Sequence, residues 1–117
     1  MTPNKAIEII DGLKPNSYSE EDKLRWINEL DGMVQKLVIQ SDEIKQYSYP
    51  EDMDKELLIP SPFENVYPLY LEAQIDYNNR EYAQYNNSAS MFEAQYSEYK
   101  KAYIREHKAK ENKGVVL

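Results

Sequence analysis

The chain has 117 residues, no cysteine and a formal net charge of −7. Its length fits a single domain, and the lack of cysteine excludes disulfides and thiolate metal sites. A negative chain is repelled by nucleic-acid phosphates, which argues against conventional DNA recognition but allows DNA to pass close by. No apolar stretch approaches the roughly 20 residues that span a bilayer, and the start MTPNKAIEII lacks a secretory signal pattern. We therefore expect a soluble protein without a membrane anchor.

The first predicted helix covers residues 3–11. Thr2 is a residue type that caps helix N-termini, and Pro3 suits the first helical position because its missing N–H is not needed there. Gly12 is expected to end the helix. The turn that follows is rich in proline, asparagine and serine, and it separates this helix from the next.

The second predicted helix covers residues 20–40. Ser19 is its expected N-cap, and the three acidic residues behind it complement the positive end of the helix dipole. Gly32 falls inside the helix, where glycine costs about 1 kcal/mol, but the apolar period continues through it. We interpret this glycine as a point where a neighbouring element comes close. The apolar residues at heptad spacing are Ile27, Leu30, Val34 and Leu37.

Residues 42–60 lose the helical period and form a long connection between the second and third helices. Loops of this length without structure of their own tend to be functional or disordered. The segment is either a solvated linker or a surface for a partner. We predict that it is mobile in the isolated subunit and becomes ordered against a partner, which places the entropy cost of ordering at assembly. Its candidate interface residues are Ile44, Tyr47, Tyr49, Leu57 and Ile59.

Two further helices are predicted over residues 63–78 and 80–106. Ser61, followed by a proline and an acidic residue, is the expected N-cap of the third helix. The break between the two helices is placed at residues 78–79, and a break at residues 86–88 is the alternative.

The fourth helix carries an apolar or aromatic seam with alternating steps of three and four residues. Most of the seam is tyrosine, whose ring is apolar while its hydroxyl needs a partner or solvent. Such a seam suits a partly exposed bundle core, and it equally suits an interface with a wet rim. The candidate interface residues in it are Tyr82, Tyr85 and Tyr99.

These elements predict an all-α fold, a small bundle of about four helices with a long loop between helices 2 and 3. One helical domain is expected over residues 1–107, followed by a flexible C-terminal tail over residues 108–117. The predicted core consists of Trp26, Ile27, Leu30, Val34, Leu37, Val66, Tyr70, Ala73, Phe92 and Tyr96.

No motif for catalysis, phosphate binding or metal ligation is present in the sequence. Glu72 and Asp76 share a helix face at i, i+4 and could serve acid–base chemistry only if both lay in one pocket. His107 is the single histidine, which is too few for a di-iron site in a helical bundle. We therefore predict no enzymatic activity, no catalytic or metal-binding residues and no cofactor.

Five sequence segments in this order resemble a known family. They are LKPNSY, LRWINELDG, LLIPSP, and YLEAQIDY followed by EYAQYNNS. The chain is similar over nearly its whole length, to about residue 107, to head–tail connector proteins (head-completion or adaptor proteins) of tailed phages and prophages. One departure is Asn78–Asn79, where the family usually has Asn-Gly; asparagine also tolerates the left-handed conformation, so a helix stop survives.

The resemblance implies a structural virion protein with an all-helical fold. Such a subunit docks in a homo-oligomeric ring beneath the portal protein, extends the DNA channel and presents a platform for a head-closure or tail component. It implies location in the virion, and in the host cytoplasm during assembly, with a monomer as the possible isolated form. The alternative hypothesis is a small cytoplasmic helical module that binds or regulates another protein and has no virion role.

Overall fold

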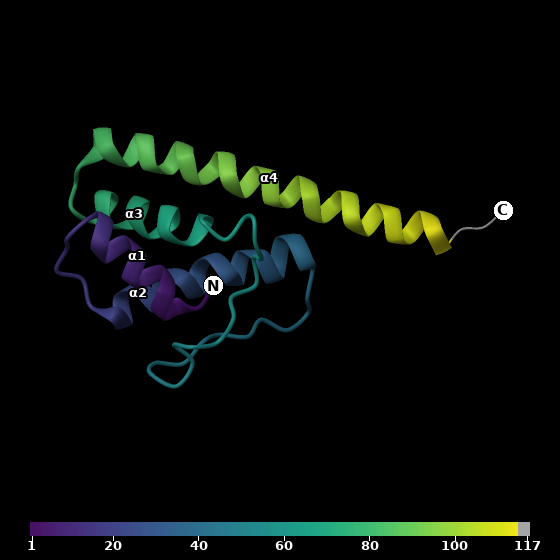
Figure 1. Ribbon diagram of the computed structural model, residues 1–117, viewed down its shortest axis with the longest axis horizontal. Coiled ribbons are helices and arrows are strands. Elements are labelled where there is room, and N and C mark those ends of the chain that lie inside the picture. Colours follow the sequence, from purple (N-terminus) through teal and green to yellow (C-terminus); the bar gives the residue numbers. More distant parts are fainter. Residues whose placement is uncertain (115–117) are drawn as a thin grey trace.

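The computed structural model describes the backbone of residues 1–114 and the side chains through residue 108. Within that range the chain is helical and contains no strand, which confirms the predicted all-α class. α3 lies centrally and packs against α1, α2 and α4, and α4 runs along the side of α3 that faces away from α1 and α2 (Figure 1). The elements are α1 (Pro3–Leu13), α2 (Glu20–Met33), the π-helical segment η1 (Val34–Ile39), α3 (Val66–Asn78) and α4 (Tyr82–Gly114).

The start of α1 agrees with the prediction, and its end lies slightly later. The Thr2 hydroxyl accepts a hydrogen bond from the Lys5 amide at 3.1 Å, as an N-cap does. The helix continues through Gly12 for one more residue. It stops there because Pro15 disfavours the helical conformation in the residue before it. Lys14 accordingly adopts an extended backbone, with φ −138° and ψ 92°.

The predicted helix over residues 20–40 is present, but it consists of α2 followed by the π-helical turn of η1. Ser19 caps α2 by accepting a hydrogen bond from the Asp22 amide at 3.0 Å. A π-helical turn holds more residues than an α-helical turn, so the heptad phase shifts within η1. Leu30 and Val34 therefore lie in the core as predicted, whereas Leu37 is 66% exposed. The prediction of Leu37 as a core residue is wrong.

α3 begins at Val66, three residues later than predicted. Pro68 explains this start, because a residue without an N–H is accommodated in the first turn of a helix and not in its interior. Asn65 occupies the N-cap position, so Ser61 is not the cap. Residues 61–65 form turns instead.

The break between α3 and α4 lies at residues 79–81, beside the predicted position at 78–79. Arg80 has the left-handed φ of 59° that interrupts the helix. Residues 86–88, the alternative break, lie inside α4.

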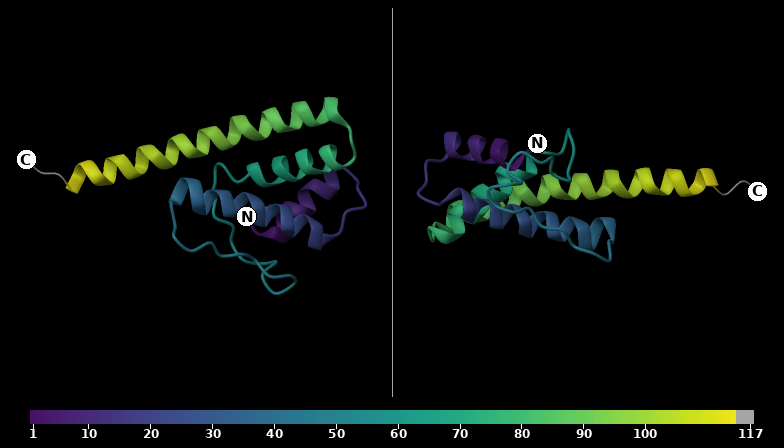
Figure 2. Two further views of the ribbon diagram at one scale, coloured as in Figure 1. Left: turned by 180° about the vertical axis from the view of Figure 1, so that it is seen from behind. Right: turned by 90° about the horizontal axis from the view of Figure 1, so that it is seen from below.

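α4 extends to Gly114, beyond the predicted end at residue 106. The predicted flexible tail over residues 108–117 therefore begins within a helix, and its last residues, 115–117, lie outside the described part of the chain. The C-terminal end of α4 runs past the other helices, with no other element beside it (Figures 1 and 2). This protruding end is a feature that the sequence did not predict.

The middle of the tyrosine seam of α4 forms part of the core. Phe92 packs against Tyr70 of α3 with ring centroids 5.0 Å apart, and it stacks on Tyr96 at 5.4 Å. Tyr99 continues the ladder and contacts Phe63 at 6.0 Å. The predicted core residues that are buried are Trp26, Ile27, Leu30, Val34, Val66, Ala73, Phe92 and Tyr96, and Tyr70 is partly buried against them.

Candidate interaction surface

The long connection between η1 and α3 is held to α2 by a buried carboxylate. Asp31 is 1% exposed. It accepts hydrogen bonds from the hydroxyl of Tyr47 at 2.5 Å, the hydroxyl of Tyr67 at 2.6 Å and the amide of Leu58 at 3.2 Å. Burial raises the pKa of Asp31 above its usual 3.8, and these three hydrogen bonds partly oppose that shift. One side chain thus fixes two separate points of the connection.

Two amide side chains on α2 and η1 add further anchors. Asn28 accepts a hydrogen bond from the Tyr47 amide at 2.8 Å and donates one to its carbonyl at 3.0 Å. Gln35 does the same for Lys45, at 2.8 and 2.9 Å. Each side chain therefore satisfies both backbone groups of a loop residue, much as a neighbouring strand would.

The second half of the connection is anchored to the N-terminal segment and α3. The Leu57 amide donates to the Met1 carbonyl at 2.9 Å, and the Asn4 amide donates to the Met53 carbonyl at 3.0 Å. The Ile59 amide donates to the Tyr67 hydroxyl at 2.8 Å. These contacts fasten the connection to the rest of the subunit and argue against the prediction that it is mobile in isolation.

The anchored connection separates the interface candidates that the sequence suggested in it. Leu57 and Ile59 are buried, so they belong to the subunit core and not to a free surface. Tyr47 is half-buried, with its hydroxyl bonded to Asp31 of α2, while Ile44 is exposed. Tyr49 is exposed at a turn, where its hydroxyl donates to Glu20 at 3.4 Å.

The exposed apolar side chains around η1, together with the half-buried Tyr103, form a surface that we call the η1 belt. Its members are Leu37, Ile39, Ile44, Leu58, Tyr103 and Ile104. They come from η1, the connection and α4, and hollows that share lining residues link them. Apolar surface gathered in this way marks contact sites for other molecules more often than scattered apolar residues do.

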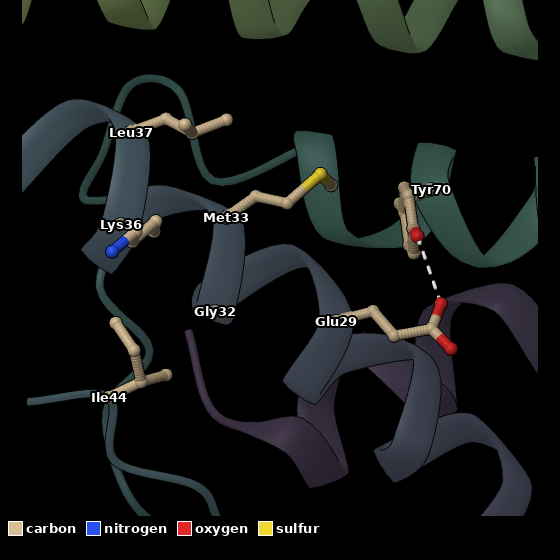
Figure 3. A pocket seen from close by; sticks show the side chains of 7 residues that line it. All are labelled: Glu29, Gly32, Met33, Lys36, Leu37, Ile44 and Tyr70. Carbon is tan, nitrogen blue, oxygen red and sulfur yellow. Dashed lines mark hydrogen bonds between the residues drawn. The ribbon is translucent and has the colours of Figure 1, made fainter.

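One hollow of the η1 belt lies between α2, η1 and α3 (Figure 3). Its volume is about 520 Å³, and the Tyr70 hydroxyl donates to Glu29 at its rim at 3.2 Å. A Cβ added to Gly32 would lie 3.9 Å from Ile44, an ordinary contact distance. The predicted neighbour of Gly32 is thus present, but it leaves room for a side chain. The lining residues are Glu29, Gly32, Met33, Lys36, Leu37, Ile44 and Tyr70.

A second hollow of the η1 belt lies between α4 and the residues before α3. Its volume is about 330 Å³, and Ile39, Leu58 and Phe63 face Tyr99 and Tyr103 across it. Tyr99, an interface candidate from the tyrosine seam, is buried but lines this hollow. A side chain of another molecule that entered this hollow would therefore contact the ring of Tyr99.

The other two candidates from the tyrosine seam lie at the opposite end of α4. Tyr82 and Tyr85 pack against Tyr77, with ring centroids 6.2 and 5.3 Å apart. This cluster sits at the turn between α3 and α4, away from the η1 belt (Figure 1). The interface candidates therefore do not form one surface.

Glu72 and Asp76 line one small hollow of about 200 Å³. Asp76 is buried and is paired with the Lys14 ammonium, and it also accepts a hydrogen bond from the Ser88 hydroxyl at 2.8 Å. This pairing ties up the carboxylate that an acid–base mechanism would need. His107 lies exposed on α4, with its ring stacked on Tyr103 at 3.8 Å. Among the described residues, no cluster of His, Cys, Asp or Glu is suited to hold a metal ion.

Comparisons with protein-family models, with curated proteins and with solved structures find no match for the chain. In the part of the chain that the structure describes, no helix is both long enough and apolar enough to cross a membrane.

Sequence reasoning missed Leu37, Ile39, Leu58 and Ile104 as surface residues. The run LVIQ at positions 37–40 was a usable signal, because three consecutive apolar residues cannot all face the core of one helix. The polar residues Asn28, Asp31 and Gln35, at i, i+3 and i+7, form a second stripe that indicates a partner for the helix.

Proposed function

We propose that the chain is a structural subunit of a tailed-phage or prophage particle, a head–tail connector that docks in a ring beneath the portal. In this role it extends the DNA channel and offers a platform for a head-closure or tail component. The protein acts through contacts with other proteins and not through catalysis. Its place is the virion, and the host cytoplasm during assembly.

The observation that carries this proposal is the η1 belt. A binding protein needs an accessible apolar surface on a stable scaffold, and the η1 belt combines exposed aliphatic side chains with a connection fixed by Asn28, Asp31 and Gln35. The all-helical fold is also the one that the resemblance implies. The negative net charge supports the role as well, because it lets DNA pass without being held.

The proposal is tested in the strain that carries the gene. The gene should lie between capsid and tail genes, and mass spectrometry of purified particles should detect the chain. Without the gene, we expect full heads that lack tails. Two results together would favour the alternative of a cytoplasmic binding module: purified particles that do not contain the chain, and normal tailed particles from the strain without the gene.

A matched pair of variants tests the η1 belt in the same assay. Leu37→Glu places a charge in the η1 belt at a side chain that is already exposed, so the fold should be retained while incorporation into particles is lost. Leu13→Glu makes the same change at an exposed leucine of α1, outside the η1 belt, and should be incorporated normally. Equal incorporation of both variants would place the interface elsewhere.

A further inference from the structure

The charges of the chain are divided between the helical bundle and the distal end of α4. Residues 1–99 contain 8 cationic and 19 acidic side chains, whereas residues 100–117 contain 6 cationic and 2 acidic ones. The two parts therefore carry formal charges of −11 and +4, which add up to the net −7. Negative charge is therefore in excess in the bundle, and positive charge is in excess at the distal end of α4.

The cationic side chains of distal α4 include an exposed stripe on one face of the helix. Lys101, Ile104, Arg105 and Lys108 are spaced i, i+3, i+4 and i+7, which places them along one face. All four are exposed, and Ile104 is 54% exposed in the middle of the stripe. We call this set the α4 stripe. It joins three cationic side chains with one exposed apolar side chain.

The α4 stripe makes no hydrogen bond or ion pair with another element of the described chain, although Ile104 and Lys108 line a hollow together with η1. Its one ion pair there is between Lys101 and Glu98 on the same helix, at 3.5 Å. The Arg105 Nε donates only to the Lys101 carbonyl, at 3.4 Å. Past this hollow, α4 extends beyond the other helices (Figure 2). A cationic, partly apolar face is thus presented to solvent.

We infer that the α4 stripe docks on the acidic bundle of a second copy of this chain. The charge complementarity argues for this occupant, because the bundle of every copy carries the opposite sign in excess. Contact between two α4 stripes would instead bring like charges together. The contact is therefore heterologous, with distal α4 of one copy on the bundle of the next, and such contacts can close into rings.

This inference deepens the proposed function, since it names the surface through which copies meet. The contact is weak in solution, because the net charges of whole subunits repel one another while the α4 stripe attracts. It is also sensitive to salt, because exposed charges are screened over about 10 Å at 0.1 M ionic strength. A template such as a portal would then be needed to complete an ordered ring.

Sedimentation velocity of the purified full chain over a range of concentrations tests the contact. We expect concentration-dependent association at low salt that disappears at high salt. Arg105→Glu with Lys108→Glu should weaken association at least about tenfold. Lys5→Glu with Lys55→Glu changes the net charge equally, at exposed sites off α4, and should weaken it much less. Equal loss in both double variants, or no association of the wild-type chain at low salt, would overturn the inference.

A mixing experiment tests the heterologous geometry. A dye-labelled Arg105→Glu, Lys108→Glu chain retains the acidic bundle, so it should bind wild-type chain but not itself. Binding to neither would contradict docking on the bundle, and binding to both equally would show that the α4 stripe is not needed. These outcomes are separate from the proposed function, which is decided by whether the chain is present in particles.

Discussion

Asp31 is the residue on which the shape of the connection depends most. It lies on the core side of α2, and its carboxylate receives hydrogen bonds from Tyr47, Tyr67 and Leu58. A buried carboxylate with this many partners is costly to disturb, because each hydroxyl or amide left without it would be buried and unpaired. Tyrosines 47 and 67 therefore act as polar links within the subunit.

Two tyrosines that differ in their hydroxyl contacts give a matched test. Tyr67→Phe removes a hydroxyl that donates to Asp31 and accepts from Ile59, so it should lower the free energy of unfolding by about 1–3 kcal/mol. The Tyr96 hydroxyl is buried and finds no hydrogen-bond partner among the described residues. Tyr96→Phe should therefore be neutral or stabilising. Urea denaturation of both variants measures the difference, and equal losses would contradict this view of the network.

The pH dependence of stability provides a second test at Asp31. Because its pKa is raised in the folded state, the folded chain binds the proton more tightly than the unfolded chain. Its contribution to stability is therefore fully present below pH 3.8 and decreases as pH rises through the folded pKa. Asp31→Asn cannot titrate, so the stability advantage of the wild-type chain over this variant should shrink with rising pH across that window. Urea denaturation at several pH values measures this advantage. An advantage that grows with pH would show that folding lowers the pKa of Asp31 instead of raising it.

At the scale of the elements, the sequence predicted helix identity well and helix ends less well. The caps at Thr2 and Ser19 were recognisable because their bonds are local in sequence. The late start of α3 follows from Pro68, which lies in the first turn of the helix. The sequence shows this proline but does not fix at which residue before it the helix begins. The π-helical turn of η1 could not be predicted, because the hydrogen-bond pattern at the end of this helix depends on tertiary contacts and not on the local sequence alone. The shift of Leu37 to the surface followed from it.

The phase shift at η1 leads to opposite expectations for two leucines of the same heptad pattern. Leu30 is fully buried, so Leu30→Ala should destabilise the fold by about 2–5 kcal/mol. Leu37 is exposed, so Leu37→Ala should change the free energy of unfolding by less than about 0.5 kcal/mol. Denaturant titration measures the free energy of unfolding of the two variants. A large loss at Leu37 would show that the helix keeps its α-helical phase.

Gly32 makes a further prediction for α2. A Cβ at this position would meet Ile44 only at an ordinary contact distance, so alanine fits without displacing the connection. Gly32→Ala should raise the free energy of unfolding by about 0.5–1 kcal/mol, because alanine is the better helix former. Thermal and urea denaturation measure the gain. A loss of stability would mean that the connection packs more tightly on α2 than the structure indicates.

At the scale of the molecule, the sequence predicted the bundle and many of its core residues but not its surfaces. The core could be found because apolar periodicity is a property of each helix alone. The anchoring of the connection joins residues far apart in sequence, such as Asp31 with Tyr47 and Leu58, and a local pattern does not reveal such pairs. The η1 belt and the protruding end of α4 likewise appear only once the helices are assembled.

Hydrogen exchange of the isolated chain tests most directly the claim that the connection is a fixed part of the subunit, which makes the η1 belt a preformed surface. Four amides in the connection donate hydrogen bonds to side chains of α2, η1 and α3: those of Lys45, Tyr47, Leu58 and Ile59. They should exchange far more slowly than in an unstructured peptide, with protection that approaches that of α2. Exchange of all four at unstructured-peptide rates would contradict the account, since it would show a mobile connection and an η1 belt that forms only on binding.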